Sequence, residues 1–284
     1  MILFFPQWQG AGRGHRLDAP ARLLLGAILS RVNTPGETPA NVCEVPLDPG
    51  ESLIFERGIW GRSVLLAQLA RAHELVTKQA PVPLFTLGGD CGIEIMPVGL
   101  LNARTGSFAL IWIDAHADLN TPETSPSGTF HGMPLRVLCG EGDPDFTAHV
   151  AAPLRPEQVV MLGVRDFDPG ERAFADQHRL THFAADTPRL ADRLVEHLRA
   201  RAVTNLYLHI DLDSLDPQEF SAVDFPVAGG FSVEALAGLV QSLADAFTIA
   251  GMSLTEYASP TGAGLDTLAP LLDAFARLYR KSVL

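Results

Sequence analysis

The chain has 284 residues, of which 47% are hydrophobic and 19% are charged, so it is long and apolar enough to bury a core and is not a disordered polymer. The 33 Asp and Glu residues outnumber the 21 Lys and Arg residues and give a formal net charge of −12 at pH 7. This acidic balance argues against nucleic acid as a partner, because affinity for the phosphate backbone comes largely from basic residues.

The cysteines and the N-terminal residues indicate the compartment. Cys43, Cys91 and Cys139 are too few and too scattered for a disulfide scaffold, which favours a reducing compartment, and we expect a cytoplasmic protein. The run from Met1 to Gln7 is apolar but short and has no basic leader, so we predict no signal peptide. No stretch approaches the roughly 20 apolar residues of a membrane span, so no membrane partner is expected.

Short apolar runs alternate with longer amphipathic stretches along the chain, which predicts an α/β fold with a mostly parallel sheet flanked by helices. In chain order, strands are expected at residues 2–5, 83–87, 108–113, 158–163, 205–210 and 247–254. Apolar residues at three- and four-residue spacing predict helices at residues 62–78, 191–201, 233–245 and 265–280. No linker or internal repeat divides the chain, so we expect residues 1–284 to form a single domain.

Two groups of acidic residues follow predicted strands. Asp114, His116 and Asp118 come directly after the strand at 108–113, and they share one face if the extended backbone continues. Asp211 and Asp213 follow the strand at 205–210 with the same alternate spacing. Because ligands of open parallel sheets bind beyond the carboxyl ends of the strands, we expect both groups to meet in one crevice.

The donor atoms of these two groups predict a metal centre. Four carboxylates and one imidazole suit Mn²⁺ or Mg²⁺, and they suffice for two ions about 3.5–4 Å apart that activate a water near neutral pH. A lone Asp-x-Asp pair is as often a helix cap or a turn, but two such groups at strand ends favour the metal. The longest irregular segment, residues 120–130, follows directly, and loops of that length are usually functional or mobile.

These motifs resemble those of the ureohydrolase family, which includes arginase, agmatinase, formimidoylglutamase and guanidinobutyrase. The matching segments are Gly88-Gly89-Asp90-Cys91, Asp114-Ala-His116-Ala-Asp118, His131-Gly132 and Asp211-Leu-Asp213-Ser-Leu-Asp216-Pro217. The resemblance covers most of the chain, from about Arg16 onward, and is strongest to arginase. It implies a three-layer arginase-like fold, a trimer or hexamer, and hydrolysis of a guanidino compound such as L-arginine to ornithine and urea.

The resemblance also implies the roles of site residues. Two Mn²⁺ ions would be held by Asp114, His116, Asp118, Asp211, Asp213 and Cys91. Asp118 would also orient the attacking water, and His131 would transfer a proton. Glu256 would pair with the guanidinium. The alternatives are an inert loop histidine and a solvent-facing strand-end glutamate.

Two further segments resemble the parts of arginase that hold the amino-acid end of the substrate. One implies that Asn120, Ser125 and Ser127 bind the α-carboxylate through amide and hydroxyl donors. The other implies that Asp168 and Glu171 meet the α-amino group. The second segment also suits a turn and the start of a helix, and the two interpretations carry equal weight.

Cys91 departs from the family pattern, because it stands where the first metal-binding motif ends in histidine. Sulfur favours zinc or iron-type ions over manganese. Three alternatives follow: a two-ion centre with a cysteine ligand, a centre that holds only the more carboxylate-rich ion, or a degenerate site with a buried inert thiol. The last alternative motivates a non-catalytic protein that binds a small molecule or a partner protein.

Phe225 is the second departure. It lies in Asp224-Phe225-Pro226, where arginases carry Gly-Thr-Pro. Its ring would narrow the pocket or replace a hydrogen bond by packing. A related substrate of agmatinase, guanidinobutyrase or formimidoylglutamase type is therefore the alternative to L-arginine.

Overall fold

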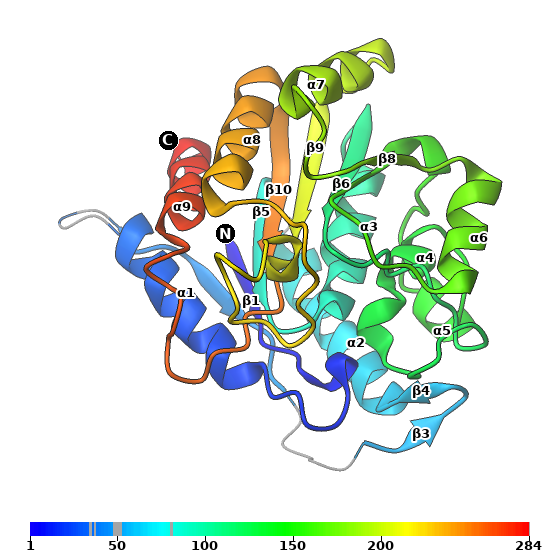
Figure 1. Cartoon of the computed structure of the whole chain (residues 1–284). Helices are drawn as coiled ribbons and strands as arrows, with labels where there is room; N and C mark the ends of the chain where they lie inside the picture. Colours follow the sequence, from blue (N-terminus) through cyan, green and yellow to red (C-terminus); the bar gives the residue numbers. More distant parts are fainter. Residues whose placement is uncertain (34–35, 37, 48–52, 80–81, 284) are drawn as a thin grey trace.

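The computed structural model describes residues 1–33, 36, 38–47, 53–79 and 82–283. In this part of the chain the centre is an eight-stranded sheet with the order β2-β1-β5-β10-β9-β6-β7-β8 (Figure 1). All its pairings are parallel. The strands are β1 (Ile2–Phe5), β2 (Val42–Glu44), β5 (Leu84–Gly88), β6 (Phe108–Ile113), β7 (Val159–Leu162), β8 (Thr181–Phe183), β9 (Asn205–Ile210) and β10 (Thr248–Leu254). A separate antiparallel hairpin pairs β3 (Phe55–Glu56) with β4 (Ile59–Trp60).

Helices cover both faces of the sheet (Figure 1). One face packs against α1 (Asp18–Val32), α7 (Leu190–Ala200), α8 (Val233–Ala246) and α9 (Ala269–Val283). The other packs against α2 (Arg62–Gln79), α3 (Ile95–Arg104), α4 (Pro134–Leu138), α5 (Pro144–Thr147) and α6 (Pro169–His178). The prediction of a three-layer α/β fold with a parallel central sheet is confirmed.

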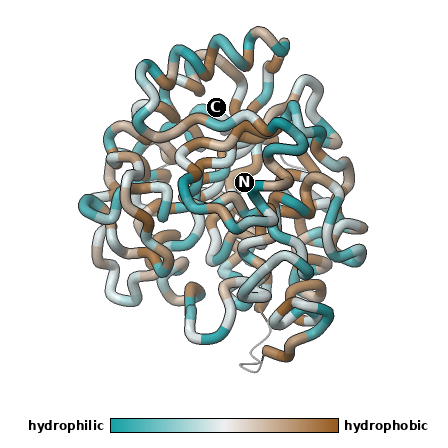
Figure 2. Tube along the Cα trace, turned by 45° about the vertical axis from the view of Figure 1, so that its right-hand side comes forward, coloured by the Kyte–Doolittle hydropathy of each residue, from teal (hydrophilic) through white to brown (hydrophobic). Residues whose placement is uncertain are grey.

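The core lies in two layers, one on each side of the sheet. Strand β6 is buried along its whole length, and its side chains alternate between the layers. Ile111 and Ile113 pack on one side, whereas Leu110 and Trp112 pack on the other. This is why the strand is apolar at every position, as expected for a sheet covered on both faces. Figure 2 shows hydrophilic and hydrophobic residues alternating along outer helices, as expected for helices that pack one side against a core.

The six predicted strands are all present, with ends that differ by one residue at most. The edge strands β2 and β8 were not predicted, because each has only three residues and a mixed burial pattern. The helix expected at 265–280 begins at Ala269 instead. The reason is Pro270, which fits the first turn of a helix but would clash with the preceding turn in its interior.

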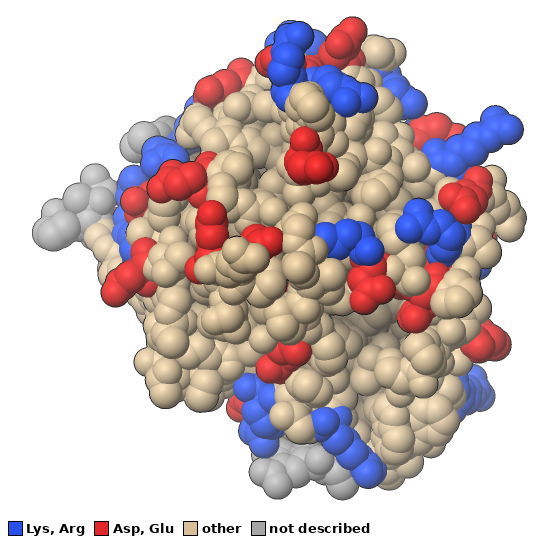
Figure 3. Space-filling view, viewed as in Figure 1, with Lys and Arg blue, Asp and Glu red and all other residues tan. Residues whose placement is uncertain are grey.

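The surface in Figure 3 carries interspersed acidic and basic side chains, and Lys and Arg form no continuous patch on this face. Among the described residues, no helix combines the length and the apolar character needed to cross a bilayer.

Candidate functional site

The candidate residues gather at the carboxyl ends of four strands that are consecutive neighbours in the sheet, β5, β10, β9 and β6. Cys91 follows β5, Glu256 follows β10, Asp211 and Asp213 follow β9, and Asp114 follows β6. All five side chains are buried. The two acidic groups of the sequence therefore meet in one place, because parallel strands end at the same edge of a sheet.

The first possible ligand group consists of Asp114, His116 and Asp213, whose ligand atoms all lie within 4.8 Å of one another. The Nδ1 atom of His116 is 2.9 Å from Asp213 Oδ2 and 3.6 Å from Asp114 Oδ1. Backbone N–H groups hold the carboxylates in place: that of His116 donates to Asp114 at 2.7 Å, and that of Ala115 donates to Asp213 at 3.1 Å. One imidazole and two carboxylates form a donor set for a divalent ion.

Cys91 lies at the centre of the second group, which it forms with Asp211 and Glu256. Its thiol donates to Asp211 Oδ2 at 3.0 Å, and its backbone N–H donates to Glu256 Oε1 at 3.1 Å. Burial and the nearby carboxylates raise the pKa of the Cys91 thiol well above its usual value. A bound cation would reverse this effect, since a coordinating thiol is deprotonated.

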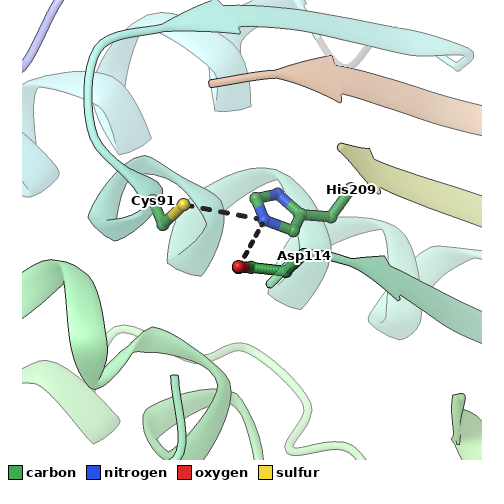
Figure 4. A group of neighbouring side chains, drawn as sticks. All are labelled: Cys91, Asp114 and His209. Atoms are coloured by element: carbon green, nitrogen blue, oxygen red, sulfur yellow. Dashed lines mark hydrogen bonds and ion pairs between the residues drawn. The ribbon is translucent and has the colours of Figure 1, made fainter. Parts of the chain in front are cut away.

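The third group joins Cys91 and Asp114 to His209, a residue that sequence reasoning missed (Figure 4). His209 Nε2 lies 3.7 Å from Cys91 Sγ and 3.7 Å from Asp114 Oδ2. Its Nδ1 lies 3.4 Å from Oε1 of Glu94, which is also fully buried and was also missed. The sequence does mark both residues, because each is an ionisable residue inside an apolar run: His209 in strand β9 and Glu94 in residues 93–96.

Asp118 lies in the same cavity but outside these three groups. The condition under which Asp114, His116 and Asp118 would share one face is not met along the whole segment, because the backbone leaves the extended conformation at Asp118, which has a φ of 51°. Its carbonyl accepts hydrogen bonds from Leu135 and Arg136 in α4, which turns the chain away from the strand direction. Glu256 has a φ of 62°, and left-handed conformations are rare for residues other than glycine. Such backbone strain clusters at functional sites.

The electrostatics of the centre show an excess of buried negative charge. Burial and the neighbouring Asp114 raise the pKa of Asp118. Burial together with Asp213 and Asp114 raises the pKa of Asp211, and burial with Asp114 raises that of Asp213 to about 6. Asp118 Oδ2 and Glu256 Oε2 are buried and have no hydrogen-bond partner. A divalent cation would relieve this repulsion between carboxylates, so the residues fit a metal centre.

A cavity of about 500 Å³ opens above this floor. All five residues predicted to bind the amino-acid end of a substrate line it, namely Asn120, Ser125, Ser127, Asp168 and Glu171. The segment predicted to be irregular, residues 120–130, forms neither helix nor strand up to residue 129, and Phe130 begins a short 3-10 helix. The loop thus supplies part of the cavity wall, while the strand ends supply the floor.

The hydrogen bonds of Asp168 and Glu171 are those expected for residues at the start of a helix, which is one of the two interpretations of this segment. Asp168 precedes α6, and Glu171 Oε2 accepts its backbone N–H at 2.8 Å while Oε1 accepts that of Leu119 at 2.9 Å. The carboxylate of Asp168 accepts from the Asn120 amide at 2.8 Å. Burial raises the pKa of Glu171 to about 7. Because both acids also line the cavity, their role toward an α-amino group stays a prediction.

The rings of His131 and Phe225 both line the cavity and pack against each other, with centroids 5.1 Å apart. His131 Nδ1 lies 3.2 Å from Glu256 Oε1. Burial alone would lower the pKa of His131, but the hydrogen bond and charge of Glu256 raise it. Phe225 also packs against His15, with ring centroids 4.8 Å apart. That its ring narrows the pocket stays a prediction.

The segment after β1 supports the turn that carries Cys91. Asp90 accepts hydrogen bonds from the Gln7 side chain at 2.9 Å and from the Gly10 backbone at 2.8 Å. The backbones approach so closely that a Cβ atom on Gly89 would lie 1.7 Å from the Gln7 carbonyl oxygen. Glycine is therefore required at position 89, and the N-terminal loop is part of the framework of the site.

Together, the fold and the site define an α/β protein with a candidate metal centre at the carboxyl edge of a parallel sheet, below a cavity that could admit a small molecule. The model of the arginase family matches residues 46–270, and the chain belongs to this family. The resemblance expected from the motifs is confirmed.

Individual relatives agree with this assignment. The arginase of Staphylococcus aureus (strain COL) is 37% identical over 176 residues, which cover 60% of this chain but only 58% of that protein. The arginase of Bacillus caldovelox is 31% identical over 229 residues, or 78% of this chain and 75% of that protein. The solved native structure of the arginase from Bacillus caldovelox at pH 5.6 superposes with a TM-score of 0.84 at 26% identity, covering 98% of this chain and 97% of that one.

Proposed function

We propose that the protein is a divalent-metal-dependent hydrolase of a guanidino compound, with L-arginine as the substrate and ornithine and urea as the products. One observation carries this proposal: grouped metal-ligand atoms form the floor of a cavity whose wall holds every residue predicted to bind an amino acid. Membership of the arginase family supports the same chemistry.

The residues proposed to hold two divalent ions, at least one of them Mn²⁺, are Asp114, His116, Asp118, Asp211, Asp213 and Cys91. Carboxylates predominate among them, and oxygen-rich sites suit manganese. Bound there, divalent ions would lower the pKa of a water molecule and stabilise the negative charge that develops during its addition to the substrate.

The side chains around the cavity suit the two ends of L-arginine. Glu256 Oε2 has no hydrogen-bond partner and offers an acceptor to the planar guanidinium. The hydroxyls of Ser125 and Ser127 can donate to the α-carboxylate, while Asp168 and Glu171 offer acceptors to the α-ammonium. The substrate would then lie with its guanidinium toward the floor and its amino-acid end along the wall.

Two residues are placed to handle protons during hydrolysis. Asp118 Oδ2, buried and unpartnered, can accept a hydrogen from the attacking water and orient it. As water adds to the guanidino carbon, the bond to the ornithine nitrogen breaks, and that nitrogen needs a proton. His131 can donate it, because Glu256 raises the pKa of His131 and keeps the imidazole protonated nearer to neutral pH.

Phe225 favours a second candidate, in which the same chemistry acts on another guanidino or formimino compound. The test is a substrate panel with Mn²⁺-loaded protein, in which urea release is measured from L-arginine, agmatine and 4-guanidinobutyrate, and formamide release from formiminoglutamate. We expect the largest kcat/KM for L-arginine. A larger value for another member would replace the substrate. Protein that is shown to hold metal but releases neither product from any of them would overturn the hydrolase.

A further inference from the structure

His209 and Cys91 place an imidazole nitrogen and a sulfur next to a carboxylate that the first ligand group already contains (Figure 4). All three residues are fully or almost fully buried. The His209 ring stacks on Trp112, with centroids 3.6 Å apart and an angle of 25° between the planes, and this fixes the direction of its nitrogens. Nε2 therefore points to Cys91 and Asp114, while Nδ1 points to the opposite side.

The surroundings of Nδ1 are those of a metal-binding histidine. A histidine that binds metal through one nitrogen almost always donates the other N–H to a carboxylate, a carbonyl or water. Here Glu94 Oε1 lies 3.4 Å from Nδ1, and Ser253 Oγ lies 3.3 Å from it. Neither carboxylate oxygen of the fully buried Glu94 has another hydrogen-bond partner, so the carboxylate has an acceptor to offer to this N–H. An N–H held toward Glu94 leaves Nε2 with its lone pair directed to the thiol and Asp114.

Asp114 is shared between two ligand groups through different oxygens. Its Oδ1 lies 3.6 Å from His116 Nδ1, and its Oδ2 lies 3.7 Å from His209 Nε2. The indole N–H of Trp112 donates to Oδ2 at 3.1 Å and holds the carboxylate in this orientation. One carboxylate thus faces an imidazole on each side, which is the arrangement of a ligand that bridges two neighbouring ion positions.

We propose that Cys91, His209 and Asp114 bind one divalent ion through sulfur, nitrogen and oxygen, that Glu94 positions His209 for this purpose, and that this position selects zinc over manganese. The neighbouring position at His116 and Asp213 keeps the oxygen-rich set that suits manganese. This inference rests on the proposed hydrolase function of the same centre, but the binding of metal can be measured without turnover.

The choice of zinc follows from the donor atoms. Thiolate and imidazole are preferred ligands of Zn²⁺, whereas Mn²⁺ prefers carboxylate, carbonyl and water oxygens. Metal binding displaces the proton of the Cys91 thiol, which passes to solvent, and the thiolate then bonds to the ion. Cys91, after β5, offers a sulfur donor, and His209 on β9 supplies the nitrogen donor of the same site.

The first experiment loads metal-free protein with Co²⁺ alone, used as a spectroscopic substitute for Zn²⁺. We expect a thiolate-to-cobalt charge-transfer band in the wild-type protein and its loss in Cys91→Ser. Cys139→Ser makes the same chemical change away from the site and should keep the band. His116→Gln should also keep the band, since it alters only the neighbouring position. Stoichiometric Co²⁺ binding without a band in the wild-type protein would overturn the proposal.

The second experiment offers Zn²⁺ and Mn²⁺ together and measures both by elemental analysis. Zinc should occupy one position in the wild-type protein and be lost from Cys91→Ser and His209→Gln. Glu94→Gln keeps the size of the side chain, so it tests the proposal even if His209→Gln fails to fold, and it should weaken zinc binding by about 10- to 100-fold. Unchanged zinc affinity in both Cys91→Ser and Glu94→Gln would overturn the assignment.

A urea-release assay on the same samples separates this inference from the proposed function. A charge-transfer band with zinc bound, but no hydrolysis of any substrate in the panel, would contradict the hydrolase and leave the zinc position intact. Urea release by protein that holds only manganese, with no band after loading with Co²⁺, would contradict the zinc position and leave the hydrolase intact.

Discussion

Arg62 and Asp143 form a buried pair of opposite charges, whereas the centre at the strand ends buries several carboxylates close to one another. Arg62 Nε and Nη2 donate to the two oxygens of Asp143, both at 2.8 Å, and the side chains are only 9% and 3% exposed. Although burial raises it, the hydrogen bonds from Arg62 hold the pKa of Asp143 below its usual value. In the centre, Asp118 Oδ2 and Glu256 Oε2 have no partner.

The difference separates a structural group from a functional one. A buried ion pair with complete hydrogen bonds is stable without a ligand. Removal of one partner leaves the other as an unpaired buried charge, which destabilises the fold. A buried cluster of like charges is unfavourable by itself and becomes favourable only when it binds something positive. A substitution in the centre should therefore abolish activity but stabilise the metal-free protein. A substitution in the ion pair should lower stability but leave the activity of the folded protein unchanged.

Among the predicted substitutions, Asp211→Asn should reduce urea release the most. Burial together with Asp213 and Asp114 raises the pKa of Asp211, so its ionised form destabilises the metal-free fold at neutral pH. We expect no measurable urea release, loss of bound metal, and a higher Tm of the chelator-treated protein. The exposed Asp186→Asn serves as the control and should change none of these. Turnover retained by Asp211→Asn would contradict the role of the centre.

His131→Asn tests a residue of the cavity that lies outside the described metal-ligand groups. If the imidazole donates the proton to the leaving amine, kcat should fall by about 10²- to 10⁴-fold while the metal content stays at the wild-type value. His182→Asn, an exposed position on β8, is the matched control. An unchanged kcat would show that the proton comes from another group.

Asp143→Asn should have the opposite signature, a loss of stability with the kcat of the folded protein unchanged. Removal of one charge from the buried pair should cost about 3–5 kcal/mol in the free energy of unfolding, measured with denaturant at neutral pH. The difference from wild type should shrink as the pH falls below about 4, because protonation of Asp143 removes the same charge.

Asp145 provides the comparison for this prediction. It also pairs with Arg62, but its side chain is 56% exposed, so Asp145→Asn should cost no more than about 1 kcal/mol. Equal effects of the two substitutions would show that burial does not decide the contribution of the pair.

Ser127→Ala should have a smaller effect than the changes at Asp211, His131 and Asp143, because it removes one neutral hydroxyl from the cavity wall. A hydrogen bond to a charged group contributes about 1.5–3 kcal/mol, so KM for L-arginine should rise by roughly 10- to 100-fold with little change in kcat. KM for agmatine, which has no carboxylate, should not change. A parallel rise for both compounds would show that the hydroxyl shapes the cavity and does not bind the carboxylate.

Much of the fold and part of the centre could be predicted because both depend on local patterns. Apolar runs of a few residues define the central strands, and Asp114, His116, Asp211 and Asp213 follow two of them at alternate positions. The path of the chain at Asp118 could not be predicted, because its left-handed backbone depends on hydrogen bonds to α4, which begins 16 residues later at Pro134.

The sequence by itself determined that the chain forms a parallel α/β sheet and that carboxylates gather at its carboxyl edge, because strand period and strand ends are local properties. Only the tertiary structure decided that His209 and Glu94 belong to the centre. In the sequence each is an isolated ionisable residue in an apolar run. Their significance comes from the pairing of β9 with β6 and from the turn after β5, which together direct an imidazole toward Cys91 and Asp114.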